Sequence, residues 1–139
     1  MAAGIAVTLQ SDAPDLRVRP VEPEGFEDFM RSLAAGKILR NATGAASICD
    51  AIVMPQPGDL TFPILQRLYG GGLVVSDEEV LRAMAMAFAH LRIVLEPGGA
   101  VALAAALFRP YLPQTVIAVA SGGNVDPALF RRALEQHTV

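Results

Sequence analysis

A polar, glycine-rich turn near the end of the sequence carries groups that could bind a ligand. Ser121-Gly122-Gly123-Asn124 follows the apolar run Thr115–Ala120 and precedes Asp126-Pro127, a pair typical of a helix start. The apolar run predicts a strand buried on both faces of a parallel sheet, and open α/β sheets bind ligands at the carboxyl ends of such strands. The turn is either a ligand site or an ordinary connection between strand and helix, and its spacing alone favours the connection. It matches no nucleotide-binding motif.

A single carboxylate, Glu96, is a second candidate. It lies between the apolar segment Ile93–Leu95 and the helical segment Val101–Phe108. A carboxylate among apolar residues must be paired or have its pKa raised, which is typical of functional groups. The alternative is a side chain that points from a turn into solvent, and the sequence leaves both readings open.

Carboxylates gather around another turn, between Glu22 and Asp28, with Glu24 and Glu27 between them. Carboxylate and backbone carbonyl oxygens are suitable ligands for Mg²⁺ or Ca²⁺. Acidic residues are equally typical of a solvated loop and of the first turn of a helix. From residue types alone, the solvated loop is the preferred interpretation.

Composition and charge limit the possible classes of function. The 139 residues are 53% hydrophobic, enough for one globular domain with a sizeable core. A net charge of −3 and a pI near 5.3 give no basic surface for nucleic acid. Cys49 is the only cysteine, which predicts a reducing, cytoplasmic compartment. No apolar run reaches the roughly 20 residues that cross a bilayer, so no membrane partner is expected.

Helical and strand-like segments must position these residues. Hydrophobic periodicity and turn residues predict helices over 1–10, 25–35, 60–69, 77–90, 101–108 and 128–136, and strands over 16–21, 73–75 and 115–120. Ser76 and Glu79 form a capping-box pattern before the fourth helix. Gly36 is expected to end the second helix, and Gly70-Gly71-Gly72 is interpreted as a flexible connection. The mixture of elements indicates an α/β fold.

Taken together, several motifs occur in the order and approximate spacing of the threonine/serine dehydratases. They are Glu22-Pro23-Glu24, Ser47-Ile48-Cys49-Asp50-Ala51, Leu60-Thr61-Phe62-Pro63-Ile64, Val75-Ser76-Asp77-Glu78-Glu79, Glu96-Pro97-Gly98-Gly99-Ala100-Val101-Ala102 and Ser121-Gly122-Gly123-Asn124-Val125-Asp126. The chain therefore resembles the C-terminal half of that family, the fold-type II pyridoxal-phosphate enzymes that also include serine racemase. The resemblance covers essentially all 139 residues. It implies a tryptophan synthase beta-like fold, a mostly parallel open sheet with flanking helices, here lacking the N-terminal portion.

The resemblance implies a set of pyridoxal phosphate contacts. In the family, the serine of the Ser-Gly-Gly-Asn motif lies against the pyridine nitrogen, a role that falls on Ser121, with Gly122 and Asn124 in the same motif. The glutamate of the Glu-Pro motif approaches the cofactor and substrate, which corresponds to Glu96. The backbone of Ala51 would lie beside the cofactor ring, at a position where many relatives have glycine.

The resemblance also implies a divalent cation. Metal-dependent relatives bind it through a glutamate, a backbone carbonyl four residues later and an aspartate six residues later. Those positions are Glu22, Phe26 and Asp28. The match favours a site for Mg²⁺ or Ca²⁺ over the solvated loop.

The departures from the family pattern concern catalysis. The family's Schiff-base lysine motif, its substrate loop and its glycine-rich phosphate cradle are not found in this sequence. Lys37 is the only lysine, and it lies in none of those contexts. We therefore assign no catalytic residue.

These observations lead to one main hypothesis. Residues 1–139 form a single C-terminal segment of a dehydratase catalytic domain, without a regulatory domain. The parent reaction would eliminate water from threonine, serine or a related hydroxy amino acid and then release ammonia and a 2-oxo acid. The segment is expected to be inactive alone, as a fragment or as half of a split enzyme completed by a separate N-terminal polypeptide.

Two other classes of function compete with this hypothesis. The chain could be a non-catalytic remnant or an interaction module, and its exposed apolar surface would then favour homo-oligomers. It could also be a stand-alone cation-binding domain that uses Glu22 and Asp28.

Overall fold

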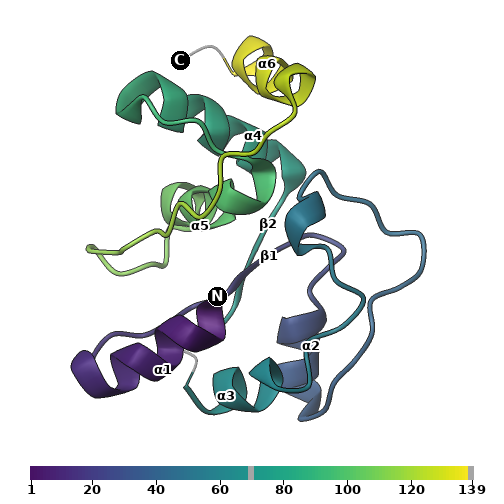
Figure 1. Ribbon diagram of the computed structural model, residues 1–139, viewed down its shortest axis with the longest axis vertical. Helices are drawn as coiled ribbons and strands as arrows, with labels where there is room; N and C mark the ends of the chain where they lie inside the picture. The colour runs from purple at the N-terminus through teal and green to yellow at the C-terminus, as the bar shows by residue number, and fades with distance from the viewer. Residues whose placement is uncertain (69–70, 138–139) are drawn as a thin grey trace. The chain divides into compact units, whose positions relative to one another are not determined.

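The computed structural model describes residues 1–68 and 71–137 (Figure 1). The chain divides into two compact units, which are described separately here. The first unit comprises Met1–Ala45 and Met54–Val74, and the second comprises Ala46–Val53 and Val75–Val139.

The first unit packs three helices around a small apolar core. They are α1 (Ala2–Asp12), α2 (Asp28–Ala35) and α3 (Thr61–Leu68). The core contains Ala3, Ala6, Phe29, Phe62 and Leu65, and the rings of Phe29 and Phe62 meet edge to face at 6.0 Å. Gly36 ends α2 with a left-handed φ of 67°, as the sequence predicts. The predicted end of the third helix, Tyr69-Gly70, lies outside the described residues.

A small parallel sheet joins β1 (Val21–Pro23) to β2 (Leu73–Val75). The N–H of Leu73 donates to the Pro20 carbonyl oxygen over 2.9 Å. Leu73 and Val75 are buried, in keeping with the apolar sequence of this strand. Strand β1 begins later than the sequence predicts, because Leu16–Pro20 contributes only an isolated bridge at Val18.

The second unit is built around helix α4 (Asp77–Met86), which continues as a π-helical turn over Ala87–Leu91. Helices α5 (Pro97–Phe108) and α6 (Pro127–Gln136) pack against α4. A 3₁₀ turn, η1 (Asp50–Ile52), contacts α5. The α4 side chains of Val80, Leu81 and Met84 are fully buried. Within the described residues, no helix is long and apolar enough to span a membrane.

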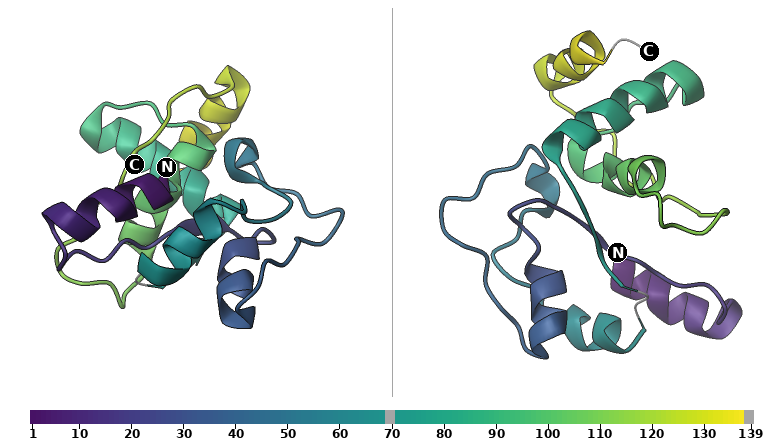
Figure 2. Two further views of the ribbon diagram at one scale, coloured as in Figure 1. Left: turned by 60° about the horizontal axis from the view of Figure 1, so that its bottom comes forward. Right: turned by 180° about the vertical axis from the view of Figure 1, so that it is seen from behind.

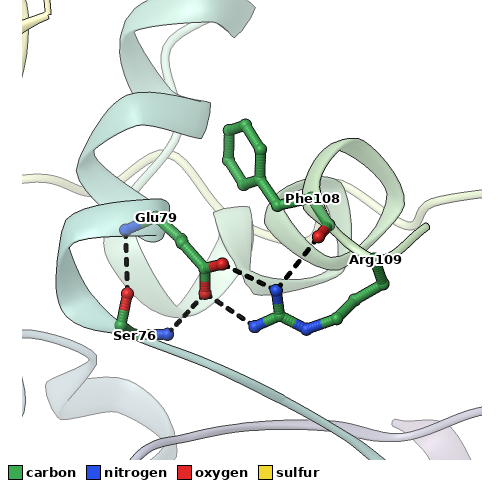
Figure 3. Close-up of polar contacts among 4 residues, drawn as sticks. All are labelled: Ser76, Glu79, Phe108 and Arg109. Carbon is green, nitrogen blue, oxygen red and sulfur yellow. Dashed lines mark hydrogen bonds and ion pairs between the residues drawn. The ribbon is translucent and has the colours of Figure 1, made fainter.

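Glu79 has two structural roles at the start of α4 (Figure 3). It completes the predicted capping box, since the Ser76 N–H donates to its carboxylate over 2.9 Å and the Glu79 N–H donates to the Ser76 hydroxyl over 3.2 Å. The same carboxylate accepts two hydrogen bonds from the Arg109 guanidinium, at 2.6 and 2.7 Å. The end of α5 is thereby fixed to the start of α4.

The apolar run 115–120 is not a strand, contrary to the prediction from sequence. In Figures 1 and 2 the connection between α5 and α6 is drawn as an irregular coil without a strand arrow. A strand needs a neighbouring strand to satisfy its backbone, and residues 116–120 have no backbone hydrogen bond to another described residue. Side chains expected to be buried are exposed, including Ile117 at 82%.

The carboxylate of Glu79 predicts a pH-dependent contribution to stability. Hydrogen bonding from Arg109 holds the pKa of Glu79 below its usual range. Glu79→Gln keeps the capping box but removes the charge, so it should lower the free energy of unfolding by roughly 1 kcal/mol at neutral pH. Because folding lowers this pKa, the charged carboxylate stabilises the folded state fully at pH values above the pKa of an unfolded glutamate, about 4.3. The difference between wild type and variant should disappear as the pH falls through the lowered pKa.

Urea unfolding followed by circular dichroism between pH 7 and pH 3 measures this difference. Glu135→Gln is the control, because its contact with Arg131 is exposed and 3.8 Å long and should contribute little at any pH. A Glu79→Gln penalty that stays constant across this pH range would contradict the assignment.

Candidate functional site

In the second unit, the start of α5 and the polar turn 121–124 lie in direct contact. The Glu96 N–H donates to the Gly122 carbonyl oxygen over 2.9 Å. Glu96 is also the N-cap residue of α5, with Pro97 in the first helical position. The half-buried Glu96 side chain lies against Gly122. The structure therefore brings together two residues that are far apart in the sequence and that the resemblance assigns to cofactor binding.

Glycine is required at this contact because the two segments leave no space for a side chain. A methyl group on Gly99 would overlap the Gly122 carbonyl oxygen and lie 2.7 Å from its nitrogen. A methyl group on Gly122 would overlap the carboxylate of Glu96. Neither glycine has a positive φ, so close packing, and not backbone conformation, explains them.

Ala51 approaches the same helix start from η1. A methyl group on Gly98 would lie 3.4 Å from the Ala51 β-carbon, which is ordinary van der Waals distance. Ala51 itself is exposed. The predicted contact residues Ala51, Glu96 and Gly122 thus border the first turn of α5.

The polar groups of the turn are available to a ligand. Ser121 and Asn124 are exposed, and among the described residues their side chains have no hydrogen-bond partner. A free hydroxyl can donate to a ring nitrogen, and an amide can both donate and accept. These donors and acceptors fit the polar edge of a pyridoxal ring.

Glu22 lies in β1 and Asp28 is the first residue of α2, and both belong to the first unit. The carboxylate of Glu22 accepts hydrogen bonds from the N–H groups of Phe29, at 2.8 Å, and Met30, at 3.0 Å. Burial raises the pKa of Glu22 to about 7, against the lowering effect of these hydrogen bonds. Burial also raises the pKa of Asp28.

Asn41 is a contact of this region that the sequence does not reveal. Its side-chain amide donates to Asp28 Oδ1 over 2.6 Å and to the Met54 carbonyl oxygen over 2.8 Å. From the sequence, Asn41 indicates only a turn. Among the residues that the structure describes, no group of three or more His, Cys, Asp or Glu side chains could hold a metal ion. A cation here would need backbone carbonyl ligands, such as that of Phe26.

Lys37 and a small pocket are two further features of the first unit. Lys37 is exposed after the end of α2, and its N–H donates to the Ser32 carbonyl oxygen. A pocket of about 130 Å³ is lined by α1, the turn after it and α3, with Arg17 and Arg67 among its residues. No predicted site residue lines this pocket, so it gives no support to the predicted chemistry.

Known proteins resemble this chain over most of its length. The sequence profile of the family described as "Pyridoxal-phosphate dependent enzyme" matches residues 1–122. The chain is 32% identical to a serine racemase of Dictyostelium discoideum, over 96% of this chain and 43% of that protein. It is 36% identical to a beta-hydroxyaspartate dehydratase of Paracoccus denitrificans, over 91% of this chain and 40% of that protein.

Solved structures give the same result. A threonine deaminase from T.th. superposes with a TM-score of 0.86 at 40% identity, covering 90% of this chain and 45% of that chain. Maize serine racemase superposes with a TM-score of 0.80 at 32% identity, covering 96% of this chain and 42% of that chain. The 139 residues thus span about two fifths of the length of the curated relatives they match.

The contact between Gly99 and Gly122 predicts a destabilising substitution. Gly99→Ala should lower the free energy of unfolding by about 1–3 kcal/mol, because the added methyl group overlaps backbone atoms of Gly122, which can move only if the packed segments shift. Alanine's better helix propensity, worth about 1 kcal/mol, should offset only part of this cost.

Gly4→Ala is the matched control, because Gly4 lies within helix α1 and has nothing within 4 Å of its added methyl group. This substitution should raise stability by about 0.5–1 kcal/mol. Thermal unfolding of the two variants measures both effects. If Gly99→Ala is as stable as Gly4→Ala, this result would contradict the close packing of Gly99 against Gly122.

Proposed function

The chain belongs to the fold-type II pyridoxal-phosphate-dependent enzymes, and on this premise we propose that it carries part of the cofactor site of a threonine/serine dehydratase. The observation that carries the proposal is the contact of Glu96 with Gly122. This contact sets a half-buried carboxylate beside an exposed turn that bears free polar side chains.

The cofactor of this family is pyridoxal phosphate, which withdraws electrons from the α-carbon of a bound amino acid. Ser121 would donate its hydroxyl hydrogen to the ring nitrogen. A neutral partner leaves that nitrogen largely unprotonated and moderates the electron withdrawal, which favours loss of a β-hydroxyl group. Gly122 and Asn124 would hold the turn against the ring, with the backbone of Ala51 beside it.

Glu96 would orient groups near the substrate through its carboxylate. A hydroxy amino acid such as threonine or serine would lose water, and hydrolysis would then give ammonia and a 2-oxo acid. The names of the relatives include both ammonia-lyases and racemases, so the preference for elimination rests on the proposed role of Ser121.

A divalent cation is a second part of the proposal. Glu22, the Phe26 carbonyl oxygen and Asp28 would bind Mg²⁺ or Ca²⁺ in the first unit. Burial disfavours the charged form of both carboxyl groups and so raises their pKa. A bound cation would favour the charged forms and counter this effect. Each Glu22 oxygen already accepts one backbone hydrogen bond, and a carboxylate oxygen retains a lone pair for a metal.

The chain alone should lack dehydratase activity, because no lysine is available in the family's context. Residues 1–139 would act as one C-terminal segment of a cytoplasmic enzyme, completed by a separate N-terminal polypeptide that supplies the lysine and phosphate cradle. The alternative is a non-catalytic remnant or interaction module, for which the exposed apolar side chains of 116–119 are the supporting observation.

Borohydride trapping of the purified chain with pyridoxal phosphate tests whether the chain has a lysine that forms a Schiff base with the cofactor. We expect no stoichiometric adduct and no 2-oxo acid from threonine or serine, because Lys37 is an exposed residue at the end of α2. Lys37→Arg is the control, because it removes the only lysine side chain and leaves the N-terminal amine as the remaining site of low-level labelling. A stoichiometric adduct at Lys37 together with 2-oxo acid release would contradict the proposal.

Co-expression with the N-terminal portion of the T.th. threonine deaminase tests the proposed role of Ser121. The pair should release 2-oxo acid, and Ser121→Ala should lower the rate by roughly two- to tenfold, the effect of one lost hydrogen bond. Ser11→Ala, on the exposed surface of α1, should not change it. A stable pair that has no activity would refute the dehydratase assignment.

A further inference from the structure

An exposed apolar surface lies beside the candidate site in the second unit. Val116, Ile117 and Val119 are 43%, 82% and 41% exposed. Valine and isoleucine side chains are usually buried, and adjacent exposed ones mark a site of interaction. We call residues 116–120 the docking segment.

The backbone of the docking segment is also without partners. Among the described residues, none of its N–H or carbonyl groups makes a hydrogen bond. The views in Figures 1 and 2 agree that the trace between α5 and α6 passes alongside the helices without joining a sheet. An apolar extended segment with unpaired backbone groups is a template for an added strand.

A second apolar segment lies next to the far end of the docking segment. A methyl group on Gly123 would lie 2.7 Å from the Val94 carbonyl oxygen, so residues 93–94 run beside the turn that follows residue 120. Ile93 and Val94 are 37% and 44% exposed. The apolar surface therefore combines two segments, and contact at Glu96 and Gly122 holds them together.

We propose that the docking segment pairs with a strand of a separate polypeptide that carries the N-terminal part of the dehydratase fold. This inference rests on the proposed function, because it names the surface through which the incomplete site would be completed. The consecutive apolar residues of the segment are typical of a parallel strand that has neighbours on both edges and cover on both faces.

A second copy of this chain fits the surface less well. Two copies related by a two-fold axis pair each docking segment on one edge only, and the other edge and the outer face stay uncovered. The relatives also supply a suitable partner, because the matched region is only 45% of the T.th. threonine deaminase chain and 42% of maize serine racemase. In each of those proteins, more than half of the chain lies outside the matched region.

The test co-expresses the 139-residue chain with a tagged N-terminal portion of the T.th. threonine deaminase and measures co-elution by affinity and size-exclusion chromatography. Wild-type chain should co-elute with the tagged partner in a 1:1 ratio. Ile117→Asp should weaken binding by about tenfold or more, which equals about 1.4 kcal/mol.

Leu60→Asp is the matched control. Leu60 is 85% exposed, close to the 82% of Ile117, but it lies in the first unit and outside the docking segment. It should leave co-elution unchanged. Because Ile117 and Leu60 are both exposed, both variants should keep the wild-type melting temperature. Circular dichroism of the chain alone checks this.

Three results would overturn the inference: wild-type chain that does not co-elute, equal loss of binding in both variants, or a homodimer of the chain alone that Ile117→Asp dissociates. The last result would assign the surface to a second copy. Co-elution without release of 2-oxo acid would instead refute the proposed dehydratase function and leave the docking surface supported, so the two failures are distinguishable.

Discussion

The contact between the start of α5 and the turn at Gly122 is the constraint on which the candidate site depends. Gly99 and Gly122 are packed so closely that neither can carry a side chain, and the hydrogen bond from Glu96 to Gly122 fixes their register. At the far end of α5, Arg109 is bound to Glu79 at the start of α4, which restrains a shift of α5 that would relieve this contact. The polar turn therefore has a defined position even though most of its own residues are exposed.

This arrangement separates the functions that a complete enzyme would need. The second unit offers polar side chains and a carboxylate around the start of α5, which suits the ring of a bound cofactor. The first unit contains the carboxylates of Glu22 and Asp28 and the only lysine, Lys37. A covalent anchor for the cofactor would have to come from elsewhere, and the apolar docking segment is the surface at which we expect the remaining part of the fold to bind.

Local signals in the sequence predicted much of the fold. The capping box at Ser76, the glycine at the end of α2 and the Asp126-Pro127 start of α6 each depend on neighbouring residues only, and each is confirmed. The strand over 115–120 was wrong because strand formation depends on a distant partner that local sequence cannot supply. The contact of Glu96 with Gly122 is equally non-local, and it could be anticipated only through resemblance to a family. The contact of Asn41 with the buried Asp28 carboxylate could not be predicted, because the sequence around Asn41 indicates only a turn.

Amide hydrogen exchange of the co-expressed pair, with and without pyridoxal phosphate, tests whether the cofactor binds between Glu96 and Ser121. The cofactor should slow exchange in peptides covering the start of α5 and residues 120–124, because the ring would lie between Glu96 and Ser121. Peptides around Lys37 should be unchanged. Protection around Lys37 without protection at residues 120–124 would contradict this binding site, because it would place the cofactor in the other unit.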